Sequence, residues 1–107
     1  MKRSKQLPNV HPGEILREEF LKPLGVTQYQ LAKRLHVPLT RISEICRRRR
    51  GVSADTALRL ARFFGTSSKF WLGLQEDYDL EEELRVGRHE IEAIAPFAPF
   101  APLVDAG

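Results

Sequence analysis

The chain has 107 residues, with 17 Lys/Arg, 14 Asp/Glu and a formal net charge of +3. This length suits one domain that buries its core without disulfide bonds. No apolar run is long enough to span a membrane, and the single cysteine, Cys46, has no partner for an intrachain disulfide. The basic N-terminus lacks the apolar segment of a secretory signal, so we expect a cytoplasmic protein with no membrane association.

The charge is unevenly distributed along the chain. Residues 1–52 hold 12 Lys/Arg and 4 Asp/Glu, a net charge of +8, whereas residues 53–107 hold 5 and 10, a net charge of −5. A basic half favours DNA as a partner, because each neutralised phosphate releases counterions. The acidic half favours water or a basic protein.

Residues 1–9 include three cations and almost nothing apolar, so we predict a flexible basic arm. Such an arm either contacts DNA or is a solvated end without a role. From His11 the sequence HPGE starts a first helix, which the sequence KPLG at 22–25 is predicted to end. No Cys or His stands at ligand spacing from His11, so we expect no metal there. The buried stripe of this helix is predicted to be Ile15, Leu16, Phe20 and Leu24.

Residues 27–50 (TQYQLAKRLHVPLTRISEICRRRR) predict two short helices joined by a tight turn. Apolar residues recur at helical spacing and the pattern breaks once, at residues 36–38. Because proline lacks an N–H and disfavours the α region before it, one helix should end at 35–36 and the next begin at 38–39. The small Ala32 allows the helices to cross closely. The pattern indicates a helix-turn-helix, although a helical hairpin in a bundle has similar spacing.

The second of these helices leaves a basic, hydrogen-bonding face exposed, which suits a major groove. Thr27 is placed to cap the first helix of the pair, and Gln28 is placed to reach a phosphate. The arginines at 47–50 point in different directions around a helix end, so no bundle could bury them all. The simpler alternative is that these residues only cap helices and face solvent. We predict base-edge or phosphate contacts by Thr40, Arg41 and Ser43, and backbone contacts by Gln28 and Arg48.

Two further helices are predicted after residue 52. Ser53 is expected to cap the first, with a buried stripe of Ala57, Leu58, Ala61 and Phe64. Ser67 or Ser68 should cap the next, which carries more aromatic residues than a small core easily holds. We predict that three side chains of this helix lie partly in the core and partly in a dimer interface: Phe70, Trp71 and Leu74. Pure core packing is the alternative.

Residues 11–74 resemble the HigA-type antitoxins of the Xre helix-turn-helix superfamily, through HPGEIL, TQYQLAKRL, VPLTRISEI and ADTALRLARFFGTSSKFWLGLQ. The resemblance implies an all-α fold with a compact five-helix domain like that of lambda repressor, which we place at residues 10–86. It leaves both ends of the chain unaccounted for, and the prolines of residues 87–107 predict a proline-rich extended tail there. It implies a sequence-specific DNA-binding homodimer that represses its own operon and neutralises a RelE-like mRNA-cleaving toxin. A stand-alone repressor without a toxin partner is the alternative.

Carried over onto this chain, the resemblance implies a recognition helix that starts at Pro38, with DNA-facing positions at Leu39, Thr40, Arg41, Ser43, Glu44 and Arg47. Relatives usually carry an asparagine-glycine pair at the end of this helix, where this chain has Arg47 and Arg48. Without that glycine, either Arg48 adopts a left-handed conformation or the helix runs longer. We favour the longer helix.

The fifth helix is expected to end near Val86, and residues 90–94 to add a short turn. The Pro-Phe-Ala repeat at 96–102 favours an extended, polyproline-like course. We predict that Phe97 and Phe100 dock on an apolar surface of the dimer or of the toxin, while the glutamates at 81–83 face the toxin's basic side. A flexible end without a role is the alternative.

Enzymatic activity is not expected. The three histidines fall in a helix start, a turn and the acidic end of the chain, without a nucleophile-base pairing. No glycine-rich phosphate loop is present either. The sequence therefore predicts no enzyme and no cofactor.

Overall fold

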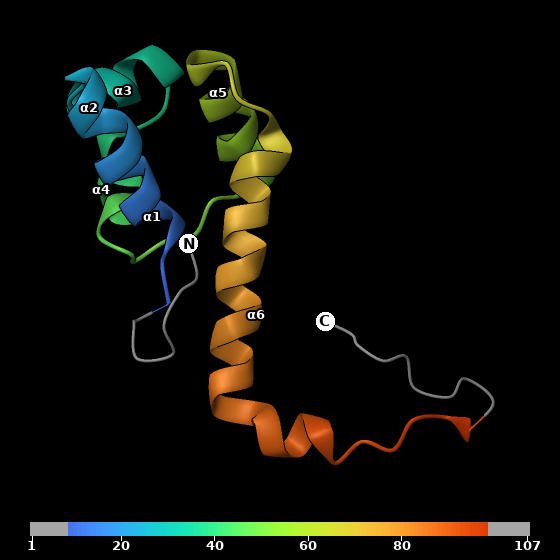
Figure 1. Cartoon of the computed structure of the whole chain (residues 1–107). Helices are drawn as coiled ribbons and strands as arrows, with labels where there is room; N and C mark the ends of the chain where they lie inside the picture. The colour runs from blue at the N-terminus through green and yellow to red at the C-terminus, as the bar shows by residue number, and fades with distance from the viewer. Residues whose placement is uncertain (1–8, 99–107) are drawn as a thin grey trace.

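Five helices and no strand make up residues 9–98, the part of the chain that this computed structural model describes (Figure 1). The first helix comprises α1 (Pro12–Ile15), a π-helical turn η1 (Leu16–Leu21) and α2 (Lys22–Leu24). The others are α3 (Gln28–Leu35), α4 (Leu39–Cys46), α5 (Ala54–Phe64) and α6 (Ser68–Glu92). The predicted five-helix, all-α fold is confirmed. The basic arm, apart from Asn9, and the tail beyond residue 98 lie outside the described residues.

The π-helical turn changes which residues of the first helix are buried. A π turn holds an extra residue, so the buried face shifts along the sequence. Leu16 and Leu21, five residues apart, are therefore buried, and the prediction was wrong for Leu24, which is 60% exposed. The helix also runs one residue past Pro23 and ends at Gly25, whose φ of 68° is left-handed.

α3 and α4 form the predicted helix-turn-helix, and the turn between them has the predicted limits, since α3 ends at Leu35 and α4 begins at Leu39. The turn opens at His36 (φ 62°), and the Val37 N–H reaches back to the Ala32 carbonyl over 3.0 Å. These bonds close the end of α3 before Pro38 starts the next element. The side chains between the two helices are all buried: Leu31, Ala32, Leu35, Ile42 and Ile45.

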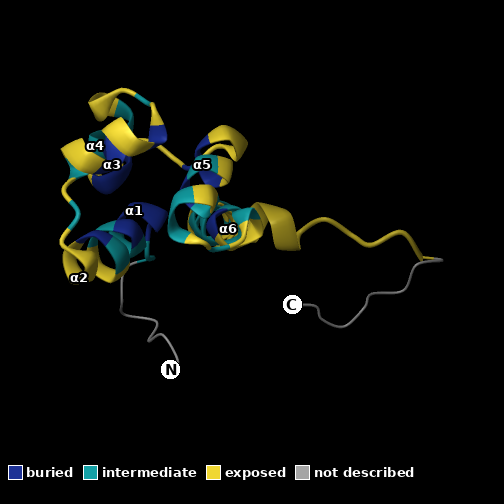
Figure 2. Cartoon of the chain, turned by 90° about the horizontal axis from the view of Figure 1, so that it is seen from above, coloured by how far each residue is buried: buried dark blue, intermediate teal, exposed yellow. Residues whose placement is uncertain are grey.

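α5 and the start of α6 close the other side of the core. We call the bundle formed by α1 to α5 and the first turns of α6 the head, and in Figure 2 the buried residues of the helices face its centre. α5 buries Ala57 and Leu60, whereas Leu58 is 62% exposed, so the predicted stripe was wrong at that position. Trp71 is fully buried and its indole N–H donates to the Thr66 hydroxyl over 2.8 Å. Because no part of Trp71 reaches solvent, the prediction that it contributes to a dimer interface was wrong; it is a core residue.

α6 extends well past the other four helices (Figure 1). Its backbone leaves helical geometry once, at Gly87 (φ −121°, ψ 16°), close to the predicted end at Val86. Helical structure then resumes and reaches Glu92, inside the segment expected to be tail. Residues 88–98 are exposed. Within the described residues, no helix is both long enough and apolar enough to span a membrane.

Gly13 lets the start of α1 touch the backbone of α4. A Cβ atom at this position would lie 1.8 Å from the Ile45 carbonyl oxygen, far inside van der Waals contact. Two residues nearby secure the same contact: Arg17 Nη1 donates to the Cys46 carbonyl over 2.9 Å, and the Cys46 side chain is buried. Burial raises the pKa of the Cys46 thiol, which suits a packing side chain and not a reactive one. The C-terminal end of α4 is thereby fixed against the first helix.

Replacing Gly13 with alanine should push α4 away from α1, because the new methyl group meets backbone atoms that cannot rotate aside. We expect a loss of about 3 kcal/mol in the free energy of unfolding, measured by urea denaturation. Gly73→Ala is the matched control: no atom lies within 4 Å of a Cβ there, so helix propensity alone should stabilise the chain by up to about 1 kcal/mol. Equal stability of the two variants would contradict this account.

Candidate nucleic-acid interface

The first two turns of α4 present one apolar and two short polar side chains at the surface. Leu39 is 45% exposed, Thr40 is exposed, and Ser43 is half-buried one turn on. Pro38, at the N-cap position, makes no side-chain hydrogen bond, so it leaves the N–H groups of the first turn uncapped by a side chain. This end of α4 can therefore offer donors to a nucleic acid through both its side chains and its backbone.

Thr27 and Gln28 lie at the start of α3. The Thr27 hydroxyl accepts from the Gln30 N–H over 3.0 Å, and the Gln30 side chain accepts from the Thr27 N–H over 2.9 Å, which is a complete capping box. Thr27 thus has the capping role that the sequence predicted. Gln28 is half-buried in the first turn, and its contact with a phosphate stays a prediction.

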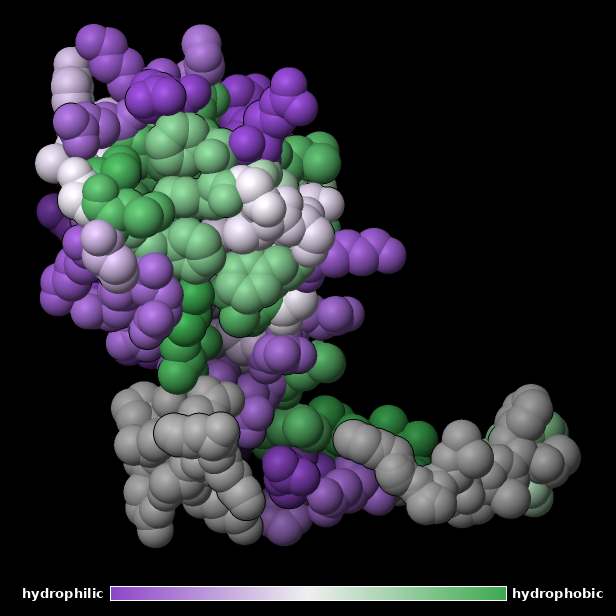
Figure 3. Space-filling model, turned by 45° about the horizontal axis from the view of Figure 1, so that its top comes forward, coloured by the Kyte–Doolittle hydropathy of each residue, from purple (hydrophilic) through white to green (hydrophobic). Residues whose placement is uncertain are grey.

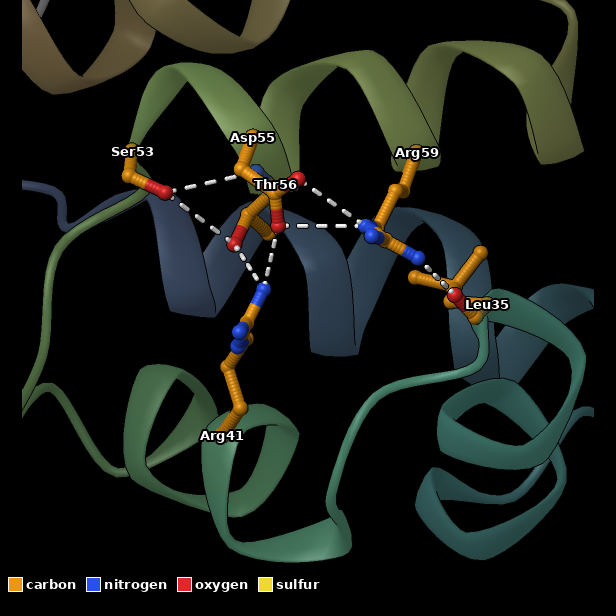
Figure 4. A network of polar contacts seen from close by, with 6 residues as sticks. All are labelled: Leu35, Arg41, Ser53, Asp55, Thr56 and Arg59. Carbon is orange, nitrogen blue, oxygen red and sulfur yellow. Dashed lines mark hydrogen bonds and ion pairs between the residues drawn. The ribbon is translucent and has the colours of Figure 1, made fainter.

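Arg41 points toward α5 and not outward (Figure 4). Its Nη1 lies 2.6 Å from Asp55 Oδ2, and Asp55 also accepts from Arg59 Nε over 3.1 Å. Arg59 Nη1 in turn donates to the Leu35 carbonyl at the end of α3 over 2.8 Å. Hydrogen bonds from Arg41 first, and then from Arg59, lower the pKa of the Asp55 carboxyl.

These contacts tie α3, α4 and α5 together around one exposed carboxylate. Sequence spacing did not indicate that Arg41 pairs with Asp55, because fourteen residues separate the two. Opposite charges in the first turns of two successive helices are too common to have singled out this pair. The predicted DNA contact of Arg41 remains a prediction, now for a side chain that already has a partner.

The arginine run begins where α4 ends. The prediction of a longer helix was wrong: α4 stops at Cys46, and Arg48 is left-handed with φ 67°. The Arg48 N–H bonds the Ile45 carbonyl over 3.0 Å and the Arg49 N–H bonds the Glu44 carbonyl over 2.8 Å, the pattern of a Schellman motif. These bonds offset the cost of about 1–2 kcal/mol for a non-glycine residue in this region. The Cys46 carbonyl is meanwhile taken by Arg17, so it does not extend the helical ladder.

Three of the four arginines form a basic surface at this end of α4. Arg50 folds back so that its Nη2 lies 2.6 Å from Glu44 Oε1, which gives Glu44 a partner within the chain. Arg47, Arg48 and Arg49 are exposed. The recognition face predicted from sequence thus has a cationic end, and both Arg41 and Glu44 have partners within the chain.

A second surface surrounds the buried Trp71. Phe20 and Phe70 contact its ring with centroid distances of 4.9 and 5.0 Å, and Phe64 contacts Phe20 at 4.9 Å. Phe70 is 40% exposed and Leu74 is half-buried, so these two can still meet a partner. Figure 3 shows hydrophobic side chains gathered on one face of the head. Sequence spacing within α6 could not show that rings from the first helix and α5 join this cluster.

His11 is buried beneath α6 and caps the first helix. Its Nδ1 accepts from the Gly13 N–H over 2.9 Å, and its ring meets that of Tyr78 edge to face at 4.8 Å. Burial, and then the charge of Arg48, lower the pKa of His11. Among the described residues, no group of His, Cys, Asp and Glu is arranged to hold a metal ion. His11 therefore has the helix-start role that the sequence predicted.

A lowered pKa makes His11 a source of acid sensitivity. The unfolded chain takes up the proton near the ordinary value of 6.5, and the folded chain only at lower pH, so stability is full above 6.5 and falls as the pH drops below it. His11→Asn keeps a capping side chain and removes this titration. We expect the stability of the native chain, relative to the variant, to decline between pH 7.5 and 5.5 in urea denaturation. A constant difference across this range would exclude His11 as the source.

Comparison with known proteins connects this geometry to a family. The helix-turn-helix model HTH_3 matches residues 17–71. The chain is 57% identical over 76 residues to virulence-associated protein I of Dichelobacter nodosus, covering 71% of this chain and 70% of that one, and 33% identical over 97 residues to antitoxin HigA-1 of Vibrio cholerae, covering 90% of each. The solved structure of Pseudomonas aeruginosa antitoxin HigA with the higBA promoter is similar, with a TM-score of 0.80, 41% identity, and coverage of 84% of this chain and 99% of that one.

Proposed function

We propose that this chain, which belongs to the helix-turn-helix family and to its HigA-type group, is an operator-binding antitoxin. The members of this family are DNA-binding regulators and not enzymes. In this proposal the protein represses its own operon as a homodimer and neutralises a RelE-like mRNA-cleaving toxin. The observation that carries the DNA-binding part is the exposed first turn of α4, with three solvent-facing arginines at the other end of the same helix.

Thr40 and Ser43 are suited to contact bases or nearby phosphates, because short hydroxyl side chains on a helix can approach groove edges closely. Arg47, Arg48 and Arg49 are suited to phosphates, since their charges face solvent without a fixed orientation toward a base edge. Gln28, at the start of α3, would contact the backbone on the other side of the turn. The relative solved with the higBA promoter supports this use of the fold.

The proposed phosphate role of Arg48 predicts a change in salt dependence. Arg48→Ala should weaken binding to the promoter of the chain's own operon and to a scrambled duplex by similar factors. The slope of log affinity against log salt should fall by about one, as measured by fluorescence anisotropy. The matched control is Arg85→Ala, which removes the same charge from α6, far along the helix from the head. An unchanged slope for Arg48→Ala, or an equal change for both variants, would contradict this assignment.

A dimer is proposed because one α4 helix reads only half of a two-fold operator. Two copies must hold their α4 helices roughly 34–36 Å apart to enter successive major grooves. The surface best suited to this pairing includes Phe70 and Leu74 beside the aromatic cluster, because it is apolar and reaches solvent. The buried Trp71 would support this surface from below without touching the partner.

The outer part of α6 is the surface we propose for the toxin. Residues 76–83 hold six acidic side chains, which suits a protein that binds the negative backbone of mRNA. Exposed apolar side chains add area for packing: Leu80, Val86 and Ile91 on the same helix are 58, 75 and 46% exposed, and Ile94 just after it is 70% exposed. Phe97, at 67% exposed, continues this apolar surface into the tail; the proposed partner of Phe100 concerns a residue outside the described range.

Co-expression with the product of an adjacent gene tests the toxin part. We expect a stable complex in size-exclusion chromatography and loss of the neighbour's mRNA cleavage when this chain is present. Changing Leu80 and Ile91 together to serine should weaken that complex while operator binding persists, because both residues lie outside the helix-turn-helix. A chain that represses its operon but binds no neighbouring product would instead be a stand-alone repressor.

A further inference from the structure

The contact between Arg41 and Asp55 gives one arginine of the recognition helix a partner before any nucleic acid arrives. Arg41 is the third residue of α4, where side chains meet the groove in helix-turn-helix proteins. Its side chain is 27% exposed and its Nη1 lies 2.6 Å from Asp55 Oδ2 and 3.5 Å from the Thr56 hydroxyl. The neighbouring Thr40 has its side chain in solvent.

Asp55 is fixed in a position to hold this arginine. The hydroxyl of Ser53 caps α5 by accepting from the Thr56 N–H, and Arg59 donates to both carboxylate oxygens of Asp55 over 3.1 Å (Figure 4). Arg59 is itself anchored on the Leu35 carbonyl. The carboxylate is therefore oriented by its own helix and by a second arginine, so it does not depend on Arg41 for its place.

A carboxylate that accepts from a guanidinium makes the same kind of charge-assisted hydrogen bond as a DNA phosphate does. An arginine that already has such a bond gains little from exchanging it for a phosphate, and it releases fewer counterions from the DNA when it does so. Among residues 9–98, no carboxylate forms an ion pair with Arg47, Arg48 or Arg49 at the other end of the helix. The arginines of this face would then differ in how much they contribute to sequence-independent binding.

We propose that Asp55 is a specificity-determining residue, which occupies Arg41 in place of a phosphate and so keeps it from contributing to sequence-independent DNA binding. This inference rests on the proposed DNA-binding function. Asp55 lowers affinity for arbitrary DNA while it keeps α4 attached to α5 in the orientation that a specific complex needs. Weak binding to arbitrary sequence matters because non-specific sites far outnumber the operator in a genome.

The test is the salt dependence of binding to a scrambled duplex and to the promoter duplex of the chain's own operon. Asp55→Asn should raise affinity for the scrambled duplex about threefold to tenfold and steepen its salt slope by about one, because Arg41 becomes free to meet a phosphate. Promoter affinity should rise less, since α4 loses a contact with α5, so the ratio of the two affinities should fall. Glu81→Gln, on the exposed outer part of α6, is the matched control for the change in net charge.

Two further variants connect the effect to Arg41. Arg41→Ala should leave the scrambled-duplex affinity and its salt slope unchanged, in contrast to Arg48→Ala, although each variant removes one arginine at an end of α4. In the double variant with Asp55→Asn, the gain in affinity should disappear. Circular dichroism tests whether each variant is folded. If the Asp55→Asn variant is not folded, the comparison of Arg41→Ala with Arg48→Ala still decides the proposal.

A smaller salt slope for Arg41→Ala would overturn the inference, because Arg41 would then already meet a phosphate in the native protein. A gain from Asp55→Asn that survives without Arg41 would overturn it as well. Failure of the proposed function gives a different result: a promoter duplex bound no better than the scrambled one. Absence of DNA binding altogether would overturn both.

Discussion

The close approach of the first helix to the end of α4 is the constraint on which the placement of the recognition helix depends. Only glycine at position 13 lets the α1 backbone come this near to the Ile45 carbonyl, and Arg17 then bonds the next carbonyl, at Cys46. With that end of α4 held, the Ile42 and Ile45 side chains enter the core and the opposite face is left to solvent. The surface that we propose to face DNA thus results from backbone contact on the far side of the helix.

The arginines of this chain differ in the partners that they have within the fold. Arg17 and Arg59 bond carbonyl groups at the ends of α4 and α3, where the helix dipole is negative and the last carbonyls lack helical partners. Arg47, Arg48 and Arg49 face solvent instead. A basic composition therefore overstates the charge available to a polyanion, because part of it is used to join helices. The net charge of a segment indicates a class of partner. Only the contacts within the fold show which charged side chains remain available to bind that partner.

α6 joins two different environments in one helix. Its first turns supply Trp71 to the core and Phe70 to the surface, so they complete the head. Its outer turns lie beyond the other helices and combine acidic with exposed apolar side chains (Figure 1). Asn9, at the start of the described residues, is bound to α6 here, because its side chain donates to the Tyr78 carbonyl over 2.8 Å and to Glu82. The head and the outer part of α6 can thus serve different partners.

The sequence by itself determined the helix count, the turn between α3 and α4 and the caps at His11, Thr27 and Ser53, because apolar periodicity, proline and capping residues act over a few neighbouring positions. It could not determine what depends on contacts between distant segments. Because of the π-helical turn, Leu21 and not Leu24 is buried in the core. The Arg17 bond to Cys46 accompanies an early end of α4, and Asp55 forms an ion pair with Arg41. Likewise, full burial of Trp71 needed rings from three helices. Local spacing determines elements, whereas only tertiary structure decides which of their side chains remain free to act.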